Sequence, residues 1–179
     1  MQVRHAAGAA LLLCATMISG ATLAWEKPFS LGAGFYGTSF TAEGYESYDF
    51  SGIAITGSAA FSNHLAARVT YFLLEDETPL PITESEGADV QLLLGTGLLY
   101  EGFKAYGSVG VFRDNWSMGT LSESFTCGQL GFGLGYNWPA LTLDFAVNLR
   151  QARDYKQKAY FPVADLSVGS SMLSLALRF

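Results

Sequence analysis

Few residues of this 179-residue chain are of the types that catalyse reactions. A hydroxyl becomes a nucleophile when a base such as histidine takes its proton, and the chain has two histidines, His5 and His64. His5 lies in an amino-terminal segment that we expect to be removed, and His64 follows Ser62 and Asn63 in a predicted tight turn. The His and Cys spacing also fits no metal site. We therefore predict no catalytic residue, no metal ligand and no cofactor, and hence no enzyme.

Five charged residues stand at alternate positions in segments that are otherwise apolar, small or uncharged. They are Arg68, Lys104, Asp144, Arg150 and Arg178. A period of two indicates a β-strand whose two faces differ. If the apolar face points outward, these charges share an interior, where an isolated ion costs several kcal/mol. We predict a polar network centred on Asp144, which either fills a narrow interior or lines a narrow ion path.

Alternation of this kind recurs in eight segments, joined by short turns and longer polar loops in strict succession. The predicted strands are 29–40, 50–61, 65–74, 89–100, 103–112, 125–138, 141–150 and 166–179, and the predicted long loops are 41–49, 75–88, 113–124 and 151–165. Strands of this length cross an apolar band at a tilt. Because a free strand edge in hydrocarbon cannot be satisfied, the first and eighth strands should pair. We predict an all-β fold, an eight-stranded antiparallel up-and-down transmembrane β-barrel.

The amino end has the pattern of a secretory signal peptide. Arg4 and His5 precede an apolar run to Ile18, and small residues follow up to Ala24. We predict a signal peptide over 1–24, with cleavage after Ala24 or alternatively Ala21, and a single barrel domain over 25–179. The chain is half hydrophobic and carries a formal net charge of −6, which argues against disorder and against nucleic acid as a partner.

Alternation alone does not say which face points outward. A soluble eight-stranded barrel of lipocalin type would turn the apolar face inward and place Asp144 and Arg150 in water. The glycines at 131, 133 and 135 favour the membrane arrangement, because a solvated strand surface rarely needs a row of glycines.

The final segment alternates Leu173, Leu175, Leu177 and Phe179 with small, polar or charged residues and ends on the aromatic ring. Together with the signal peptide, the eight strands and the loop asymmetry, this pattern resembles the small eight-stranded outer-membrane barrels of OmpA/OmpX type over the whole mature length. The resemblance implies an integral protein of the bacterial outer membrane with periplasmic termini, which we expect to be a monomer. It also implies that Phe179 belongs to the signal read by the barrel-insertion machinery.

We expect a non-enzymatic barrel that acts through its extracellular loops, in envelope structure, lipopolysaccharide contact, or surface recognition and adhesion. Outer-membrane lipid, lipopolysaccharide and an extracellular partner are the expected contacts. The loop 151–165 is the only basic one, and aromatic and basic side chains together suit sugar rings and phosphates. We therefore predict a contact surface made of Tyr155, Lys156, Lys158 and Tyr160. The acidic segment 75–89 is either simply solvated or contacts lipopolysaccharide phosphates through divalent ions.

Two alternative functions remain open at this point. One is a narrow ion-conducting pore through the charged interior. The other is a binder of small hydrophobic ligands, in a pocket formed by inward-facing Phe72, Leu93, Leu99, Tyr106 and Phe112.

Overall fold

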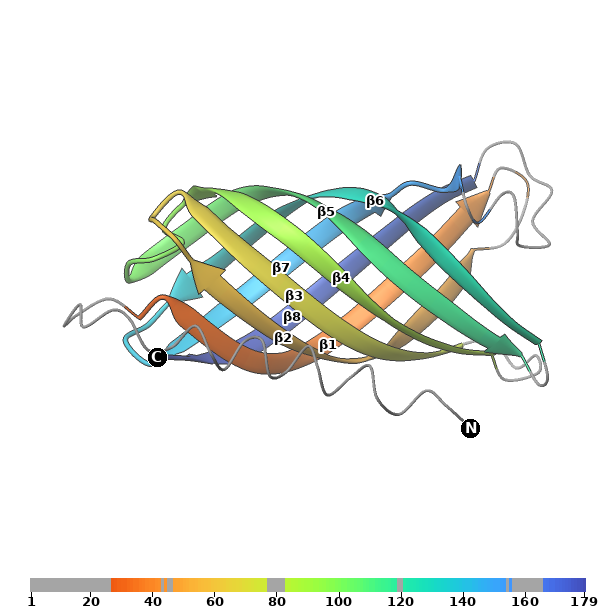
Figure 1. Cartoon of the computed structure of the whole chain (residues 1–179), viewed down its shortest axis with the longest axis horizontal. Helices are drawn as coiled ribbons and strands as arrows, with labels where there is room; N and C mark the ends of the chain where they lie inside the picture. The colour runs from red at the N-terminus through yellow and green to blue at the C-terminus, as the bar shows by residue number, and fades with distance from the viewer. Residues whose placement is uncertain are drawn as a thin grey trace.

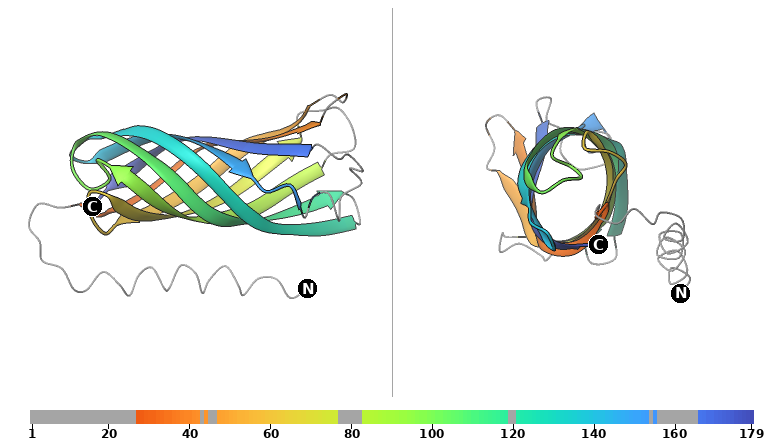
Figure 2. Two further views of the ribbon diagram at one scale, coloured as in Figure 1. Left: turned by 90° about the horizontal axis from the view of Figure 1, so that it is seen from above. Right: turned by 90° about the vertical axis from the view of Figure 1, so that its left-hand side faces the viewer.

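The computed structural model describes residues 27–42, 44, 47–76, 83–118, 121–153, 155 and 166–179. Its antiparallel strands follow one another in chain order around a single closed barrel (Figure 1). They are β1 (Phe29–Ala42), β2 (Tyr48–Ala60), β3 (Leu65–Asp76), β4 (Thr83–Thr96), β5 (Gly102–Met118), β6 (Leu121–Asn137), β7 (Leu141–Arg150) and β8 (Leu166–Arg178). Seen along its axis the sheet is a closed ring (Figure 2). The predicted all-β, eight-stranded up-and-down barrel is confirmed.

The barrel closes because β1 pairs with β2 on one side and with β8 on the other. If register partners are followed from Ser30 through every strand, the row returns to β1 at Phe40, not at Ser30. This offset tilts the strands, and an eight-stranded barrel of this kind has an interior just wide enough for side chains to fill. Inward-facing residues from opposite walls can therefore touch.

The apolar face points outward. Along β7 exposed and buried residues alternate without a break. Leu149 is 74% exposed, Phe35 on β1 is 73% exposed and Leu130 on β6 is 64% exposed, whereas Asp144 and Arg150 are buried inside. This arrangement rules out the soluble alternative, which required the opposite orientation, and suits a wall that faces lipid. Within the part of the chain described, no helix is long and apolar enough to cross a membrane.

The end that carries the short turns is rich in aromatic rings. Phe29 stacks on Phe179 at a centroid distance of 6.2 Å, and Tyr136 contacts both Phe103 at 5.1 Å and Trp138 at 4.8 Å. The carboxyl terminus lies at this same end (Figure 1). Rings gathered at one level of an apolar wall mark a membrane–water interface.

The predicted boundaries of three strands, β4, β5 and β6, are wrong. Strand β4 covers 83–96, not 89–100. Most of the predicted loop 113–124 is also strand, because β5 and β6 form a tall hairpin in which Met118 and Leu121 are register partners. The predicted boundaries followed the apolar residues. Strand pairing continues beyond the point where outward residues become polar, as at Arg113 and Asn115, so the apolar pattern ends before the strand does.

We expect Gly133→Val to destabilise the barrel strongly. A side chain at Gly133 would overlap the ring of Tyr106 on the neighbouring strand, and overpacking of this kind costs about 1–3 kcal/mol or more. At Gly107, which faces outward, a Cβ atom would meet nothing closer than 3.8 Å, so Gly107→Val should stay within about 0.5 kcal/mol of the parent. The measurement is the urea concentration at which heat-modifiable gel migration is lost. Equal midpoints for the two variants would contradict this packing.

Candidate functional site

A cluster of charges lies inside the barrel near the short-turn end. Asp144 on β7 pairs with Arg68 Nη2 on β3 at 3.0 Å and with Lys104 Nζ on β5 at 2.5 Å. The Tyr106 hydroxyl donates to the same carboxylate and accepts from Arg68 Nη2 at 2.8 Å. All four side chains are buried. We call Arg68, Lys104, Tyr106 and Asp144 the lower cluster.

Glycines on β6 make room for the lower cluster. Gly133 is the register partner of Tyr106, and Gly135 is the partner of both Lys104 and Asp144. A Cβ atom at Gly135 would come within 2.5 Å of Lys104 Cε. The inward glycines therefore let long side chains from β5 reach over β6 to Asp144 on β7.

Arg178 was grouped with Asp144 in the sequence prediction, but the structure gives it other partners. Its guanidinium donates to backbone carbonyls, those of Leu99 at 2.5 Å and Trp138 at 2.9 Å. These carbonyls belong to two of the short turns. Arg178 thus ties the turns together at the mouth of the barrel.

Arg150 belongs to a second, separate cluster farther along the lumen. Its Nη2 donates to the Tyr36 hydroxyl at 2.8 Å, its Nη1 lies 3.5 Å from Asp114 Oδ2, and its guanidinium stacks 4.3 Å from the centre of the Phe112 ring. Tyr36 also donates to Asp89 Oδ2 at 3.1 Å. We call Tyr36, Asp89, Asp114 and Arg150 the upper cluster.

Tyr36, Asp89 and Asp114 were not predicted as interior polar residues. Asp89 was counted with the acidic segment 75–89, at the first position of the predicted strand 89–100, and Asp114 was placed in the loop 113–124. Both are at most 2% exposed. The signal that could have placed Asp114 is its spacing: Phe112, Asp114 and Trp116 continue the inward alternation of β5. For Asp89 the corresponding signal is that Gln91, two residues farther along β4, faces the interior, because residues two apart on a strand share a face.

Aromatic rings close the lumen beyond the upper cluster. Tyr155 is fully buried, stacks on Phe125 at 4.5 Å, meets Phe40 edge-on at 5.1 Å, and donates its hydroxyl to Asp114 Oδ2 at 2.8 Å. Burial, with the nearby Asp114 carboxylate, raises the pKa of the Tyr155 phenol well above its usual range, so the hydroxyl stays a donor. We call this group the aromatic plug; it consists of Phe40, Phe50, Phe112, Trp116, Phe125 and Tyr155.

The predicted loop contact surface is wrong for Tyr155. A ring with no exposed surface and a hydrogen bond to Asp114 cannot contact an extracellular partner in this conformation. Lys156, Lys158 and Tyr160 lie outside the described residues. Tyr155 instead packs inside the barrel.

The predicted hydrophobic pocket does not form as one unit. Phe72 and Phe112 pack in the upper part of the lumen, and Leu93 and Tyr106 pack in a separate group below. Phe72 stacks on Tyr36 at 4.6 Å, and Tyr106 lies over the space at Gly133. These rings fill volume rather than surround an opening.

His64 lies in the exposed turn between β2 and β3, where its Nδ1 is 2.7 Å from the Gly95 carbonyl. Among the residues that the structure describes, no three His, Cys, Asp or Glu side chains are placed to hold a metal ion.

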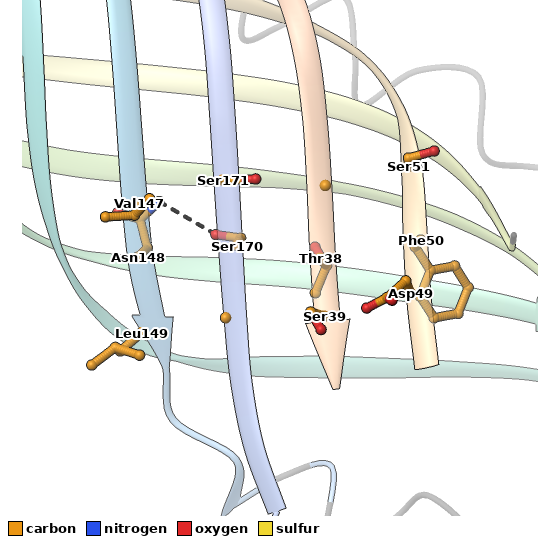
Figure 3. Close-up of a pocket in the computed structure, with 12 residues that line it drawn as sticks. Thr38, Ser39, Asp49, Phe50, Ser51, Val147, Asn148, Leu149, Ser170 and Ser171 are labelled. Atoms are coloured by element: carbon orange, nitrogen blue, oxygen red, sulfur yellow. Dashed lines mark hydrogen bonds between the residues drawn. The ribbon is translucent and has the colours of Figure 1, made fainter. Parts of the chain in front are cut away.

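Two polar features mark the outer wall at the end opposite the short turns. A hollow of about 490 Å³ crosses β7, β8, β1 and β2 and is lined by exposed Ser51 and Ser171 and by half-buried Ser39 and Asp49 (Figure 3). On the next strands, exposed Glu75 and Glu84 are register partners. Two like charges directly opposite each other on one face repel, so this pair favours a bridging cation or solvent.

The fold is that of small outer-membrane β-barrels. The chain is similar in structure to Ail, the attachment invasion locus protein of Yersinia pestis (20% identity, 86% of this chain and 99% of that chain covered, TM-score 0.56). It is also similar to NspA, Neisserial surface protein A (17%, 84% and 95%, 0.53), and to the outer membrane protein OprG of Pseudomonas aeruginosa (13%, 86% and 96%, 0.52). No family model matches the sequence, and no curated protein matches it. At these identities the likeness concerns the fold.

We expect Asp144→Ala to destabilise the barrel by about 3–5 kcal/mol, because Arg68 and Lys104 would be left buried without their counter-charge. The free energy of unfolding is measured by urea titration in detergent, with Glu101→Ala in an exposed turn as the control. Single-channel conductance in planar bilayers is measured in parallel and should stay near zero. A large conductance gain with unchanged stability would contradict a plugged lumen.

We expect Tyr155→Ala to open the aromatic plug. Cys127 is a buried member of the same cluster of side chains. Loss of the Tyr155 ring should therefore speed the reaction of the Cys127 thiol with a water-soluble reagent by at least about tenfold. A tenfold change corresponds to about 1.4 kcal/mol in the free energy of opening. Tyr155→Phe keeps the stacking and loses one hydrogen bond, which is worth about 0.5–1.5 kcal/mol. Its labelling rate should lie much closer to that of the parent. If both variants label alike, the ring is not the seal.

Proposed function

We propose that this protein is an integral, non-enzymatic barrel of the bacterial outer membrane, with periplasmic termini, that acts as a monomer through its outer wall and extracellular rim by contact with lipopolysaccharide. The observation that supports this proposal is the filled lumen. Two charged clusters and the aromatic plug occupy the interior at successive levels. Because the barrel's own side chains occupy its interior, the outer surface is the part that is available to partners.

The position of the polar features supports lipopolysaccharide as the contact. The hollow lies where the apolar wall ends: Leu149 and Val147 form one border, and Ser39, Ser51 and Asp49 lie on its other strands. Hydroxyl and carboxylate groups suit the hydroxyls of a sugar at a lipid–water boundary. The Glu75–Glu84 pair suits a divalent cation shared with a lipid phosphate, because Mg²⁺ and Ca²⁺ prefer oxygen ligands.

We expect the double variant Glu75→Gln and Glu84→Gln to retain less lipopolysaccharide than the parent. The barrel is refolded into detergent, mixed with lipopolysaccharide in the presence of Mg²⁺, and the bound lipid is counted by native mass spectrometry. Retention by the parent should fall several-fold with a chelator and in the double variant, since both remove the cation bridge.

Glu101→Gln is the matched control, because Glu101 is equally exposed but lies in a turn at the opposite end of the barrel. This control should retain lipopolysaccharide as the parent does. Retention that is insensitive to both the chelator and the double variant would count against the proposal, and so would equal retention of a phospholipid without sugar.

A further inference from the structure

On the outward face of β5 the apolar wall ends at an arginine. Val109 and Val111 are 47% and 57% exposed, and the next outward residue is the exposed Arg113. Because residues two apart on a strand share a face, Arg113 is the first polar side chain above the apolar band on this strand. The strand runs away from the short turns, so Arg113 lies toward the end of the barrel opposite the carboxyl terminus (Figure 1). A cation at the edge of an apolar wall lies at the level of lipid headgroups.

Charges of opposite sign occupy different strands at this level of the outer wall. Exposed Glu75 lies on β3, and exposed Glu84 and Glu86 lie on β4, whereas Arg113 is on β5. The outward residues beyond Arg113 on β5 and β6 are uncharged; they are Asn115, Ser117, Ser122 and Ser124. Glu123 alternates with them and belongs to the other face, with its register partner Trp116. An anion is therefore repelled from β3 and β4 and attracted to β5.

Arg113 has no carboxylate of its own to neutralise it. Its register partners are Ala88 on β4 and Thr126 on β6, and neither is charged. The diagonal neighbour Glu86 accepts a hydrogen bond at 3.3 Å from the hydroxyl of Tyr71 on β3, the strand on the far side of β4 from Arg113. Within the part of the chain that the structure describes, Arg113 forms no ion pair. Its positive charge is therefore available to an external anion.

Asn115 provides a second donor on the same face. The Ser124 hydroxyl donates to Asn115 Oδ1 at 2.7 Å across the β5–β6 pair. This bond engages the amide oxygen, so Nδ2 is the group that Asn115 offers to a ligand. Residues two apart on a strand are separated by about 6.6 Å, and the side chains of Arg113 and Asn115 can therefore reach one phosphate group. Arginine binds phosphate through parallel N–H groups that match its geometry.

We propose that Arg113 and Asn115 bind a phosphate group of lipopolysaccharide directly, on the outward face of β5. This inference rests on the proposed contact with lipopolysaccharide and names the chemical group of that lipid which β5 binds. The Glu75–Glu84 pair binds a phosphate only through a bridging divalent cation, whereas the Arg113 guanidinium needs none. The two sites therefore differ in their dependence on Mg²⁺, and this difference separates them experimentally.

The test compares two forms of lipid A, the phosphorylated lipid part of lipopolysaccharide, in the presence of a chelator. Each barrel is refolded, checked by heat-modifiable gel migration, and mixed with lipid A or with lipid A stripped of its phosphates. Bound lipid is counted by native mass spectrometry. The parent should retain the phosphorylated form roughly three- to tenfold better. Arg113→Gln should abolish this preference, and Arg113→Lys, which keeps the charge but loses the planar fork, should keep part of it.

Arg153→Gln controls for net charge, because Arg153 is an exposed cation that follows the upper end of β7 rather than standing on β5. This variant loses the same charge as Arg113→Gln and should keep the parent's preference for phosphorylated lipid A. An equal loss in both variants would reduce the effect to net charge and overturn the proposal. Retention of phosphatidylglycerol equal to that of lipid A would overturn it as well, because the site would then belong to phospholipid.

The same measurement separates this inference from the proposed function. If the parent retains lipopolysaccharide with Mg²⁺ but shows no preference for phosphorylated lipid A with the chelator, the Arg113 site is wrong and the cation bridge stands. If the parent retains lipopolysaccharide under neither condition, the proposed function is wrong together with the site.

Discussion

Every backbone N–H and C=O group of a membrane-spanning sheet must find its partner within the sheet, because hydrocarbon offers none. For this chain the requirement is met by the pairing of β1 with β8, which makes the first and last described strands neighbours. Closure with eight strands then fixes a narrow interior. The remaining features of the structure follow from the need to fill that interior with side chains that are small, aromatic or mutually compensating.

The kind of side chain that fills the interior changes from one end of the barrel to the other. Near the short turns, Asp144 satisfies Arg68 and Lys104, and Arg178 takes backbone carbonyls as its acceptors. Toward the other end, Arg150 combines an ion pair with stacking on Phe112. Aromatic rings then close the opening, with Tyr155 held by Asp114. Each of these charges has a partner of the opposite sign or a set of carbonyls, which is the condition under which buried charges are tolerated.

The wall and the rim are the surfaces that we propose for contact with partners, because side chains fill the interior of the barrel. The wall is apolar along most of its height and carries serine and carboxylate side chains at one end. Strands β4, β5 and β6 extend beyond the apolar band at that end. Extending the sheet beyond the apolar band gives the rim a rigid backbone. Ail, NspA and OprG share this fold at 20%, 17% and 13% identity, and a shared fold does not by itself define a function.

The sequence by itself determined the architecture, because the period of two along β7 and β8 and the need for a closed edge leave few solutions. It also indicated that Asp144, Lys104 and Arg68 face the interior, since parity along a strand is a local property. Only the tertiary structure decided which charges meet. Arg178 binds turn carbonyls rather than Asp144, and Arg150 pairs with Asp114, a residue that the sequence pattern had left in a loop. Tyr155 was expected outside and lies inside. The physical reason is that contacts across the lumen depend on the tilt and register offset of the strands, which place residues from distant parts of the chain at the same depth.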